Sequence, residues 1–143
     1  MLHRFINNIF AAICCPLVFR FDAATTTPGS TTKKDSETTA HRDDIGVYCK
    51  HCRTRISHPS HAIEVQGCYH HVFTNPEGVV FKIVMYDKAD CLAVSPAMLA
   101  HTWFAGYAWQ VVICPGCQTH LGWHYNEVDS PDFYGLIRDR LRE

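Results

Sequence analysis

Short runs of β-branched and aromatic residues, separated by turn residues, make up most of the chain after residue 44. Two of these runs, 70–73 and 79–86, flank an Asn-Pro-Glu-Gly turn, and we predict that they form a β-hairpin over 68–86. Two further runs, 108–113 and 120–126, are joined across a short turn and are predicted to be neighbouring antiparallel strands. The pattern favours a mainly β domain.

Only the last stretch, 131–141, has apolar residues at helical spacing. Ser130 is placed to cap the start of a helix, and Pro131 would lie in its first turn, where proline is tolerated. The sequence therefore predicts one short C-terminal helix beside the strands.

The first 44 residues differ from the rest of the chain. Residues 1–24 have a basic start, an apolar run from Ile9 to Phe19 and a pair of small residues, which is typical of a cleaved secretory signal peptide. A mitochondrial presequence or a buried amphipathic segment is the alternative. Residues 25–44 are rich in threonine and contain no aromatic or large aliphatic residue, so we expect a flexible linker. The folded domain is then 45–143, in a secreted protein; an organelle or the cytoplasm is the alternative location.

Composition refines this picture in two ways. At 143 residues, of which 47% are hydrophobic, the chain has room for one packed domain with terminal segments. A formal net charge of −1 gives no indication of a basic surface for nucleic acid. Eight cysteines and ten histidines are unusual, and they point to metal or disulfide chemistry.

Four of the cysteines form two matched C-x-x-C pairs, Cys49 with Cys52 and Cys114 with Cys117. Two residues between thiolates let one tight turn direct both sulfurs to the same ion, and two such turns complete a tetrahedral zinc site with no open position. We therefore predict one structural Zn²⁺ ion. Disulfides are the alternative in a secreted chain, although they rarely use two matched pairs.

The remaining cysteines of the predicted domain are Cys68 and Cys91. They either form one disulfide with each other or stay as buried thiols, and the sequence leaves both possibilities open. Nothing marks either thiol as an activated nucleophile, so no enzyme activity is expected.

All three tryptophans, Trp103, Trp109 and Trp123, fall within 21 residues of the chain. If 114–118 make the turn, an antiparallel register places Trp109 opposite Trp123. Alternation along the strand places Tyr125 on the same face as Trp123. We therefore predict an aromatic cage, with ordinary core packing of the tryptophans as the alternative.

The segment 91–126, which contains the tryptophans, has no Asp, Glu, Lys or Arg. Without a carboxylate nearby, a flat neutral ligand with polar edges fits such a cage at least as well as a quaternary ammonium ion does. We expect apolar walls and a few backbone hydrogen bonds to hold this ligand.

Three motifs in the second half of the domain are His101-x-Trp103-Phe104-x-Gly106-Tyr107-Ala108-Trp109, Cys114-x-x-Cys117 and His120-x-Gly122-Trp123-x-Tyr125. Together they resemble the CULT family, which is named after the thalidomide-binding domain of cereblon. Shorter matches occur at the first cysteine pair, at the turn 75–78 and at 130–136. The resemblance covers about 45–141, and its motifs are specific.

The resemblance implies a β-tent fold, in which two antiparallel sheets set at an angle are pinned by the four-cysteine zinc site. It also implies an aromatic cage for glutarimide, hydantoin, succinimide or uracil-type rings, with the backbone of His101 and Trp103 bonded to the imide edge. Tyr125 stands where cereblon has a phenylalanine, and it adds a hydroxyl. The ligand-binding residues implied in this way are Asn75, His101, Trp103, Trp109, Trp123 and Tyr125.

The chain also departs from cereblon. The Lon-like domain and the adaptor-binding helices are absent from these 143 residues, so ubiquitin-ligase adaptor binding is not expected. The chain looks like the stand-alone CULT proteins, and its N-terminal segment fits their secreted forms. The expected partner is a small cyclic ligand or a protein end that bears one, with no nucleic acid and no membrane span.

Two other functions remain open. A methionine sulfoxide reductase B-like enzyme shares the β-tent, but no cysteine follows Cys117, where its catalytic residue would be expected. A protein-interaction domain without a ligand would use the tryptophans as core residues.

Overall fold

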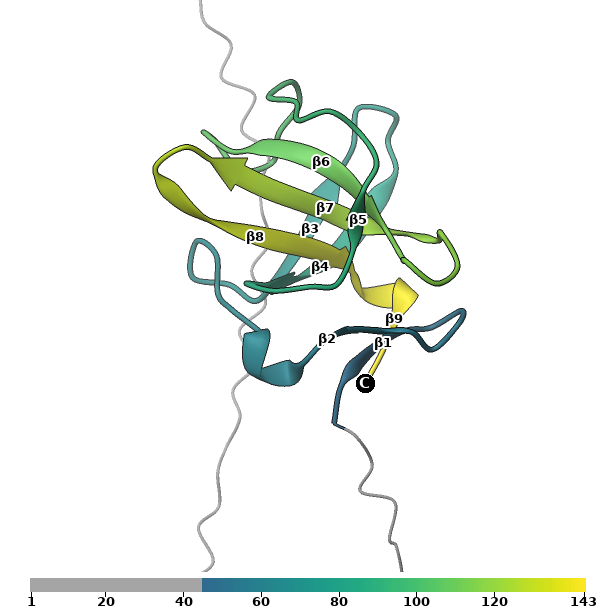
Figure 1. Ribbon diagram of the computed structural model, residues 1–143. Coiled ribbons are helices and arrows are strands. Elements are labelled where there is room, and N and C mark those ends of the chain that lie inside the picture. Colours follow the sequence, from purple (N-terminus) through teal and green to yellow (C-terminus); the bar gives the residue numbers. More distant parts are fainter. Residues whose placement is uncertain (1–44) are drawn as a thin grey trace, which may run out of the picture.

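The computed structural model describes residues 45–143, which form two antiparallel sheets and two short 3-10 helices (Figure 1). The signal peptide and linker predicted for 1–44 lie outside the described residues. The elements are β1 (Val47–Cys49), β2 (Arg55–Ser57), η1 (Pro59–His61), β3 (His70–Thr74), β4 (Val80–Tyr86), β5 (Leu92–Ala93), β6 (Ala108–Ile113), β7 (His120–Glu127), β8 (Ser130–Ile137), η2 (Arg138–Arg140) and β9 (Leu141–Arg142). The prediction of a mainly β domain is confirmed.

The larger sheet has six strands in the order β3-β4-β8-β7-β6-β5, and the smaller sheet has three in the order β2-β1-β9. Every pairing is antiparallel. In Figure 1 the small sheet lies below the large one, on the side where η2 leads the chain from β8 to β9. Two antiparallel sheets joined at a cluster of four cysteines confirm the predicted β-tent.

Strands β3 and β4 form the predicted hairpin, and Asn75 closes its turn. The side-chain Oδ1 of Asn75 accepts hydrogen bonds from the backbone N–H groups of Glu77 and Val79, at 3.1 and 2.8 Å. Gly78 has a φ of +84°, a conformation that glycine adopts without strain. Local bonds therefore fix the shape of this turn.

The segment predicted as a C-terminal helix is instead strand β8 followed by η2, so that prediction is wrong. Strand β8 lies in the middle of the large sheet, between β4 and β7. Phe133 and Ile137 pack on one face of this sheet, whereas Tyr134 and Leu136 pack on the other. Residues 133–137 of β8 are covered on both faces, so this half of the strand has no polar side to show a period of two, and its apolar residues also fit helical spacing.

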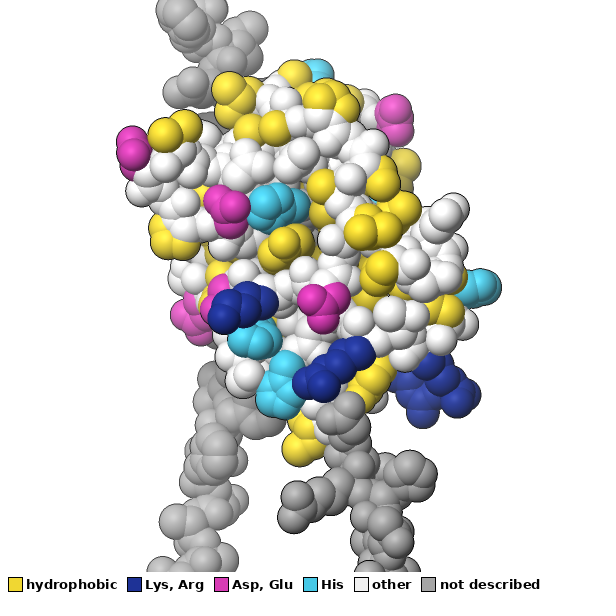
Figure 2. Space-filling view, viewed as in Figure 1, with side chains coloured by type: hydrophobic (Ala, Val, Ile, Leu, Met, Phe, Trp, Pro, Cys, Tyr) yellow, Lys and Arg dark blue, Asp and Glu magenta, His cyan; other side chains and the backbone are white. Residues whose placement is uncertain are grey.

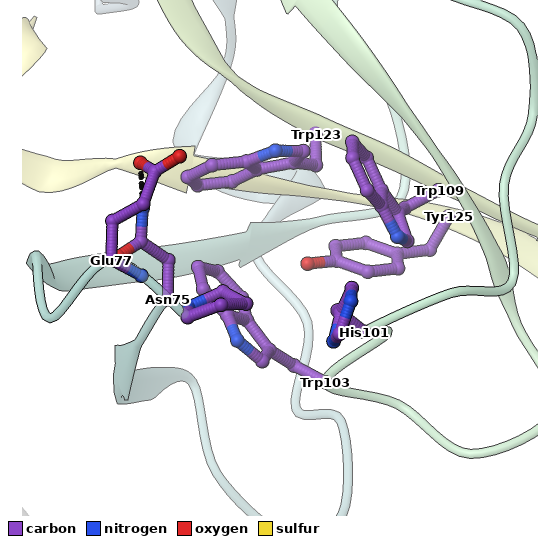
Figure 3. A pocket seen from close by; sticks show the side chains of 8 residues that line it. Asn75, Glu77, His101, Trp103, Trp109, Trp123 and Tyr125 are labelled. Atoms are coloured by element: carbon purple, nitrogen blue, oxygen red, sulfur yellow. Dashed lines mark hydrogen bonds between the residues drawn. The ribbon is translucent and has the colours of Figure 1, made fainter.

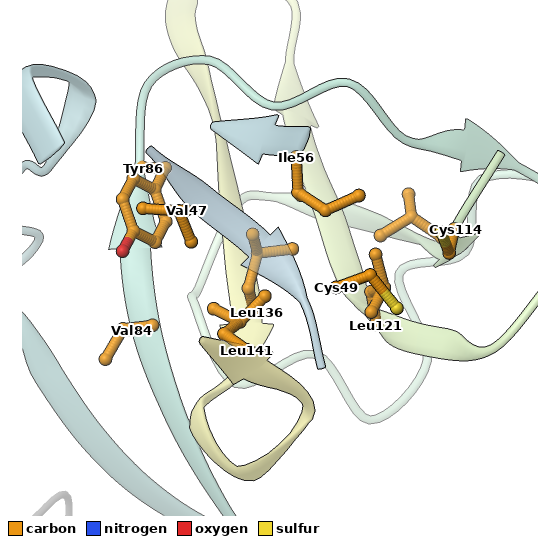
Figure 4. Packing of buried hydrophobic residues seen from close by; sticks show 10 residues of the cluster. Val47, Cys49, Ile56, Val84, Tyr86, Cys114, Leu121, Leu136 and Leu141 are labelled. Atoms are coloured by element: carbon orange, nitrogen blue, oxygen red, sulfur yellow. The ribbon is translucent and has the colours of Figure 1, made fainter. Parts of the chain in front are cut away.

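The large sheet separates two groups of buried residues. One group joins the two sheets (Figure 4), and the other lies on the opposite face, beneath the tryptophans. The first consists of Val47, Cys49, Ile56, Val84, Tyr86, Val112, Cys114, Leu121, Leu136 and Leu141. The second consists of Phe73, Ile83, Met85, Phe104, Tyr125, Phe133 and Ile137.

The register between β6 and β7 differs from the predicted one. Trp109 lies opposite Tyr125, and Trp123 lies opposite Val111, so the predicted pairing of Trp109 with Trp123 is wrong by two positions. The register shifts near the cysteine turn, where a β-bulge gives β7 one residue more than β6. A slip of two positions keeps every side chain on its own face of the sheet. The error in register therefore still leaves Trp109, Trp123 and Tyr125 on one face of the sheet.

Gly122 lies at this bulge and has a φ of +151°. A Cβ atom there would collide with the backbone of β8 at Gly135 and Leu136. Only glycine allows β7 and β8 to approach this closely next to the bulge.

Candidate functional site

The four cysteines of the two predicted pairs come together where the two sheets meet. Their sulfur atoms all lie within 4.8 Å of one another. Cys49 Sγ is 3.7 Å from Cys117 Sγ, and Cys52 Sγ is 3.5 Å from Cys114 Sγ. Four thiolates around one zinc ion, at a bond length of about 2.3 Å, have sulfur–sulfur distances of about 3.8 Å. The cluster therefore fits one tetrahedral zinc ion with no open coordination position, which makes the metal structural.

The same backbone turn holds both cysteine pairs. In the first pair the N–H of Arg53 donates to the carbonyl of Cys49 at 2.8 Å, and in the second the N–H of Gln118 donates to the carbonyl of Cys114 at 2.9 Å. Arg53 and Gln118 have φ values of +63° and +61°. The two turns therefore present their sulfurs in the same way, as the matched C-x-x-C spacing predicts.

Without a metal, the thiols of the cluster differ in acidity. Burial raises the pKa of Cys49 to about 11. The hydroxyl of Thr54 lies 3.2 Å from Cys52 Sγ, and its hydrogen bond is the largest cause of a pKa of about 6 for this thiol. A bound cation is what deprotonates Cys49 at neutral pH, so zinc binding releases protons and strengthens as the pH rises.

Cys91 has a free, half-buried thiol. A disulfide between Cys68 and Cys91, one of the two possibilities that the sequence leaves open, is therefore not formed. Burial raises the pKa of Cys91 to about 12, so its thiol is a poor nucleophile at neutral pH.

On the face of the large sheet that carries Tyr125, eight residues line a pocket of about 250 Å³. Figure 3 shows the three indole rings around this space and the Tyr125 ring among them. The six residues predicted as ligand-binding are all present: Asn75, His101, Trp103, Trp109, Trp123 and Tyr125. Pro76 and Glu77 complete the lining. These two residues were not predicted as part of the site, although they follow Asn75 directly in the predicted turn.

Two walls of the pocket rest on the β3–β4 hairpin. Trp103 stacks on Phe73 with ring centroids 4.8 Å apart, and Phe81 packs edge-on against Trp123 at 5.0 Å. Trp103 and Trp123 meet each other at 4.8 Å, with their planes at 70°. Such aromatic pairs are worth about 0.5–1.5 kcal/mol each beyond their burial. The walls are therefore fixed in place before any ligand arrives.

Trp109 forms the third wall and anchors the loop that precedes β6. Its ring N–H donates a hydrogen bond to the carbonyl of Ala100 at 2.8 Å. Its backbone exchanges two hydrogen bonds with Met98, at 2.9 and 3.0 Å. His101 follows Ala100 with a φ of +58°, which is uncommon for a residue other than glycine. Trp109 thus ties the strained part of the loop to the sheet.

The rim of the pocket is polar on the hairpin side. Asn75 Nδ2 donates to Glu77 Oε2 at 3.2 Å (Figure 3). Glu77 is exposed and is the one acidic residue among those that line the pocket. A carboxylate at this edge gives an otherwise aromatic pocket a local negative charge.

Tyr125 lies deepest, with only 1% of its surface exposed. Its ring stacks on Phe133, at 5.1 Å and 22°, and Phe104 packs edge-on against it at 4.8 Å. Burial raises the pKa of its hydroxyl far above the usual value for tyrosine, so the group stays neutral.

On the face of the molecule shown in Figure 2, the basic side chains are unevenly distributed. In Figure 2 the Lys and Arg side chains lie in the lower half of the molecule, and the upper half of this view shows none. This distribution agrees with the lack of charged residues in 91–126. Within 45–143 no helix has the length and apolar character needed to cross a bilayer.

Comparisons with known proteins identify relatives of this domain. A family model described as Yippee zinc-binding/DNA-binding/Mis18, centromere assembly, matches residues 45–137. Protein cereblon of Danio rerio is 32% identical over 74 residues, which is 48% of this chain and 17% of that protein. Protein cereblon of Drosophila grimshawi is 27% identical over 125 residues, which is 80% of this chain and 17% of that protein. The chain thus spans 17% of the length of these relatives.

The matched region contains both C-x-x-C pairs and every residue of the pocket. It also agrees with the sequence motifs that resemble the CULT family. The chain therefore belongs to the Yippee-Mis18 family and carries a cereblon-like, zinc-binding domain.

Proposed function

We propose that the aromatic cage binds a small, flat cyclic ligand of the imide or uracil type, such as the glutarimide ring of thalidomide, or a protein end that bears such a ring. The domain holds this ligand without transforming it. The observation that carries the proposal is the pocket itself, where three half-buried indoles and a buried tyrosine enclose about 250 Å³. This volume lies just below the range of roughly 300–1,000 Å³ for pockets of drug-sized ligands, so a single ring suits it.

The backbone beside the pocket offers the polar groups that such a ring needs. Within the described residues, the N–H and C=O groups of His101 and Trp103 make no hydrogen bonds. Both residues line the pocket. A cyclic imide presents a C=O, an N–H and a second C=O along one edge, and it can bond to loop amides and carbonyls of this kind.

A methionine sulfoxide reductase-like enzyme is the second candidate. The acidity and the position of the Cys91 thiol do not favour it. That chemistry needs a nucleophilic cysteine in a polarised site. Cys91 is free, but burial raises its pKa to about 12, and it is not among the residues that line the pocket. Turnover of a sulfoxide substrate that disappears in Cys91→Ser would favour the enzyme.

Nucleic-acid binding, which the description of the family model mentions, has little support in this chain. The formal net charge is −1, and the segment that carries the three tryptophans has no Lys or Arg. A surface that neutralises phosphates needs clustered basic residues.

The proposed function is tested by titrating the full chain with glutarimide, hydantoin and uracil while following tryptophan fluorescence. Saturable quenching is expected, because a ligand in the cage contacts three indoles. Trp109→Ala should abolish it while zinc content and cooperative unfolding are retained, since Trp109 is half-buried. A flat response from folded, zinc-loaded protein would contradict ligand binding, and unfolding of Trp109→Ala would favour tryptophans that serve only as core.

We further propose a secreted protein with a cleaved signal at 1–24, followed by the threonine-rich segment 25–44. The support is the residue pattern alone: a basic start, a short apolar run and small residues, then a threonine-rich segment. N-terminal sequencing of the product exported from cells tests this. A mature chain that begins near residue 25 is expected, and a full-length product inside the cell would contradict it.

A further inference from the structure

We propose that the hydroxyl of Tyr125 is a recognition group that favours cyclic ureides, rings with a second N–H, over plain cyclic imides. The inference rests on the proposed function, because it concerns which ring the same pocket prefers. It assigns a specificity role to one oxygen atom at the base of the cage.

The hydroxyl of Tyr125 is the part of this residue that is open to the pocket. The residue as a whole is 1% exposed and lines the pocket, and within residues 45–143 its hydroxyl has no hydrogen-bond partner. Because no fully buried polar side-chain atom among these residues lacks a partner, this oxygen is accessible from the pocket. In Figure 3 the oxygen atom points into the space between Trp103 and Trp123. The ring is held in this orientation by its stack on Phe133 and by the edge of Phe104. The fold therefore directs an unpartnered O–H into the pocket and gives it no freedom to turn away.

An unpartnered hydroxyl in such a place affects binding through its hydrogen bonds. Water satisfies it when the pocket is open, and a ligand that displaces this water without replacing the bond loses affinity. Burial keeps the hydroxyl protonated, so it can both donate and accept one hydrogen bond. A ligand with a polar group at this edge keeps the bond, whereas a methylene at the same place does not.

Two pairs of simple rings differ in this one respect. Succinimide becomes hydantoin, and glutarimide becomes dihydrouracil, when one ring methylene is replaced by N–H. The imide edge, the ring size and the shape stay the same within each pair. The added N–H can donate to the oxygen of Tyr125, and the adjacent carbonyl can accept from its O–H. The intrinsic cost of removing the added N–H from water is the same for every variant of the protein, so it cancels when variants are compared.

The test is the affinity ratio within each pair, hydantoin over succinimide and dihydrouracil over glutarimide, measured by calorimetry on the full chain and on Tyr125→Phe. We expect both ratios to fall in Tyr125→Phe by roughly three- to tenfold, which corresponds to the loss of one neutral hydrogen bond. Tyr107→Phe is the matched control, because Tyr107 also packs against Phe133 but does not line the pocket. Its ratios should equal those of the unchanged protein.

The possible outcomes separate this inference from the proposed function. If both ratios are the same in Tyr125→Phe and in the unchanged protein, the hydroxyl does not select ligands, although the cage still binds them. If none of the four rings binds the unchanged protein, the proposed function itself fails. Tyr125→Phe should fold with an unaltered melting temperature, and a variant that fails to fold would overturn the inference by showing that the hydroxyl bonds within the protein.

Discussion

The indole of Trp103 stacks on the phenyl ring of Phe73, with ring centroids 4.8 Å apart and ring planes only 14° from parallel. Phe73 belongs to β3, whereas Trp103 lies in the loop before β6, so the contact joins two separate segments. Phe73 itself is buried and also meets the edge of Phe104, at 5.4 Å. One wall of the pocket therefore depends on a residue that is not part of the pocket lining.

Phe73→Leu should weaken ligand binding without removing any residue that lines the pocket. The substitution keeps an apolar side chain but loses a stack worth about 0.5–1.5 kcal/mol, so Trp103 gains freedom to move. We expect a lower melting temperature and a several-fold higher Kd for hydantoin, measured by differential scanning calorimetry and fluorescence. Ile83→Val, in the same buried group, is the control because it should lose a similar stability of about 0.5–1.5 kcal/mol. An equal loss of affinity in both variants would show that only global stability matters.

Cys114→Ser should abolish cooperative unfolding, whereas Cys91→Ser should preserve it. Cys114 Sγ belongs to the cluster within 4.8 Å, but Cys91 is a free thiol outside it. Structural zinc contributes an apparent binding free energy of about 10–16 kcal/mol, which is as large as the whole stability of a small domain. Zinc analysis by mass spectrometry and thermal unfolding measure both effects. One zinc per chain in Cys114→Ser, with normal unfolding, would contradict a four-thiolate site.

The position of the tryptophans on one face of the sheet could be predicted from sequence. Alternate residues of a strand point to the same face, whichever residues of the next strand they lie opposite. Trp123 and Tyr125 are two apart on β7, and Trp109 lies opposite Tyr125 instead of Trp123, a slip of two positions. Any even slip leaves these side chains on one face. The bulge near Gly122 is what could not be predicted, because it depends on the close approach of β8.

Strand β8 could not be recognised for a related reason. One of its neighbours in the sheet, β4, is distant in the sequence, and core residues cover both faces of its second half, 133–137. A half-exposed strand shows alternation, but a fully covered one reads as a continuous apolar run.

His71 is more buried than a polar residue in a hairpin is expected to be. Only 2% of its surface is exposed, and its ring stacks on that of Phe73 with the ring centroids 5.5 Å apart.

Gln118→Val should destabilise the domain, and Gln118→Gly should not. Gln118 has a φ of +61° in the second cysteine turn, and a β-branched residue is strained there whereas glycine is not. We expect Gln118→Val to lose about 1–3 kcal/mol of unfolding free energy and to bind zinc more weakly. Urea unfolding at fixed zinc concentration measures this. Equal stability of the two variants would mean that the turn adjusts its backbone.

His120 should titrate below its usual range. Burial lowers its pKa from 6.5, and its ring lies 5.0 Å from that of Trp123. Because the folded-state pKa is below the unfolded one, the unfolded chain binds more protons between the two values. The contribution of His120 to stability is therefore complete above about pH 6.5 and is lost as the pH falls below it. Proton NMR of the His120 ring should give a midpoint under 6.5; a higher midpoint would contradict the burial effect.

Glu77 should favour ligands whose ring carries a positively charged substituent. It is the one carboxylate among the residues that line the pocket, and Asn75 Nδ2 holds its Oε2 at 3.2 Å. Because Glu77 is exposed, the gain is modest, at most about fivefold, and it decreases at high salt. We expect an aminoalkyl hydantoin to bind more tightly than the neutral alkyl hydantoin of the same length, and Glu77→Gln to remove the difference. Glu64→Gln is the control, because Glu64 is also exposed but does not line the pocket. A difference that persists in Glu77→Gln would assign the preference to the indole faces, which attract cations without any carboxylate.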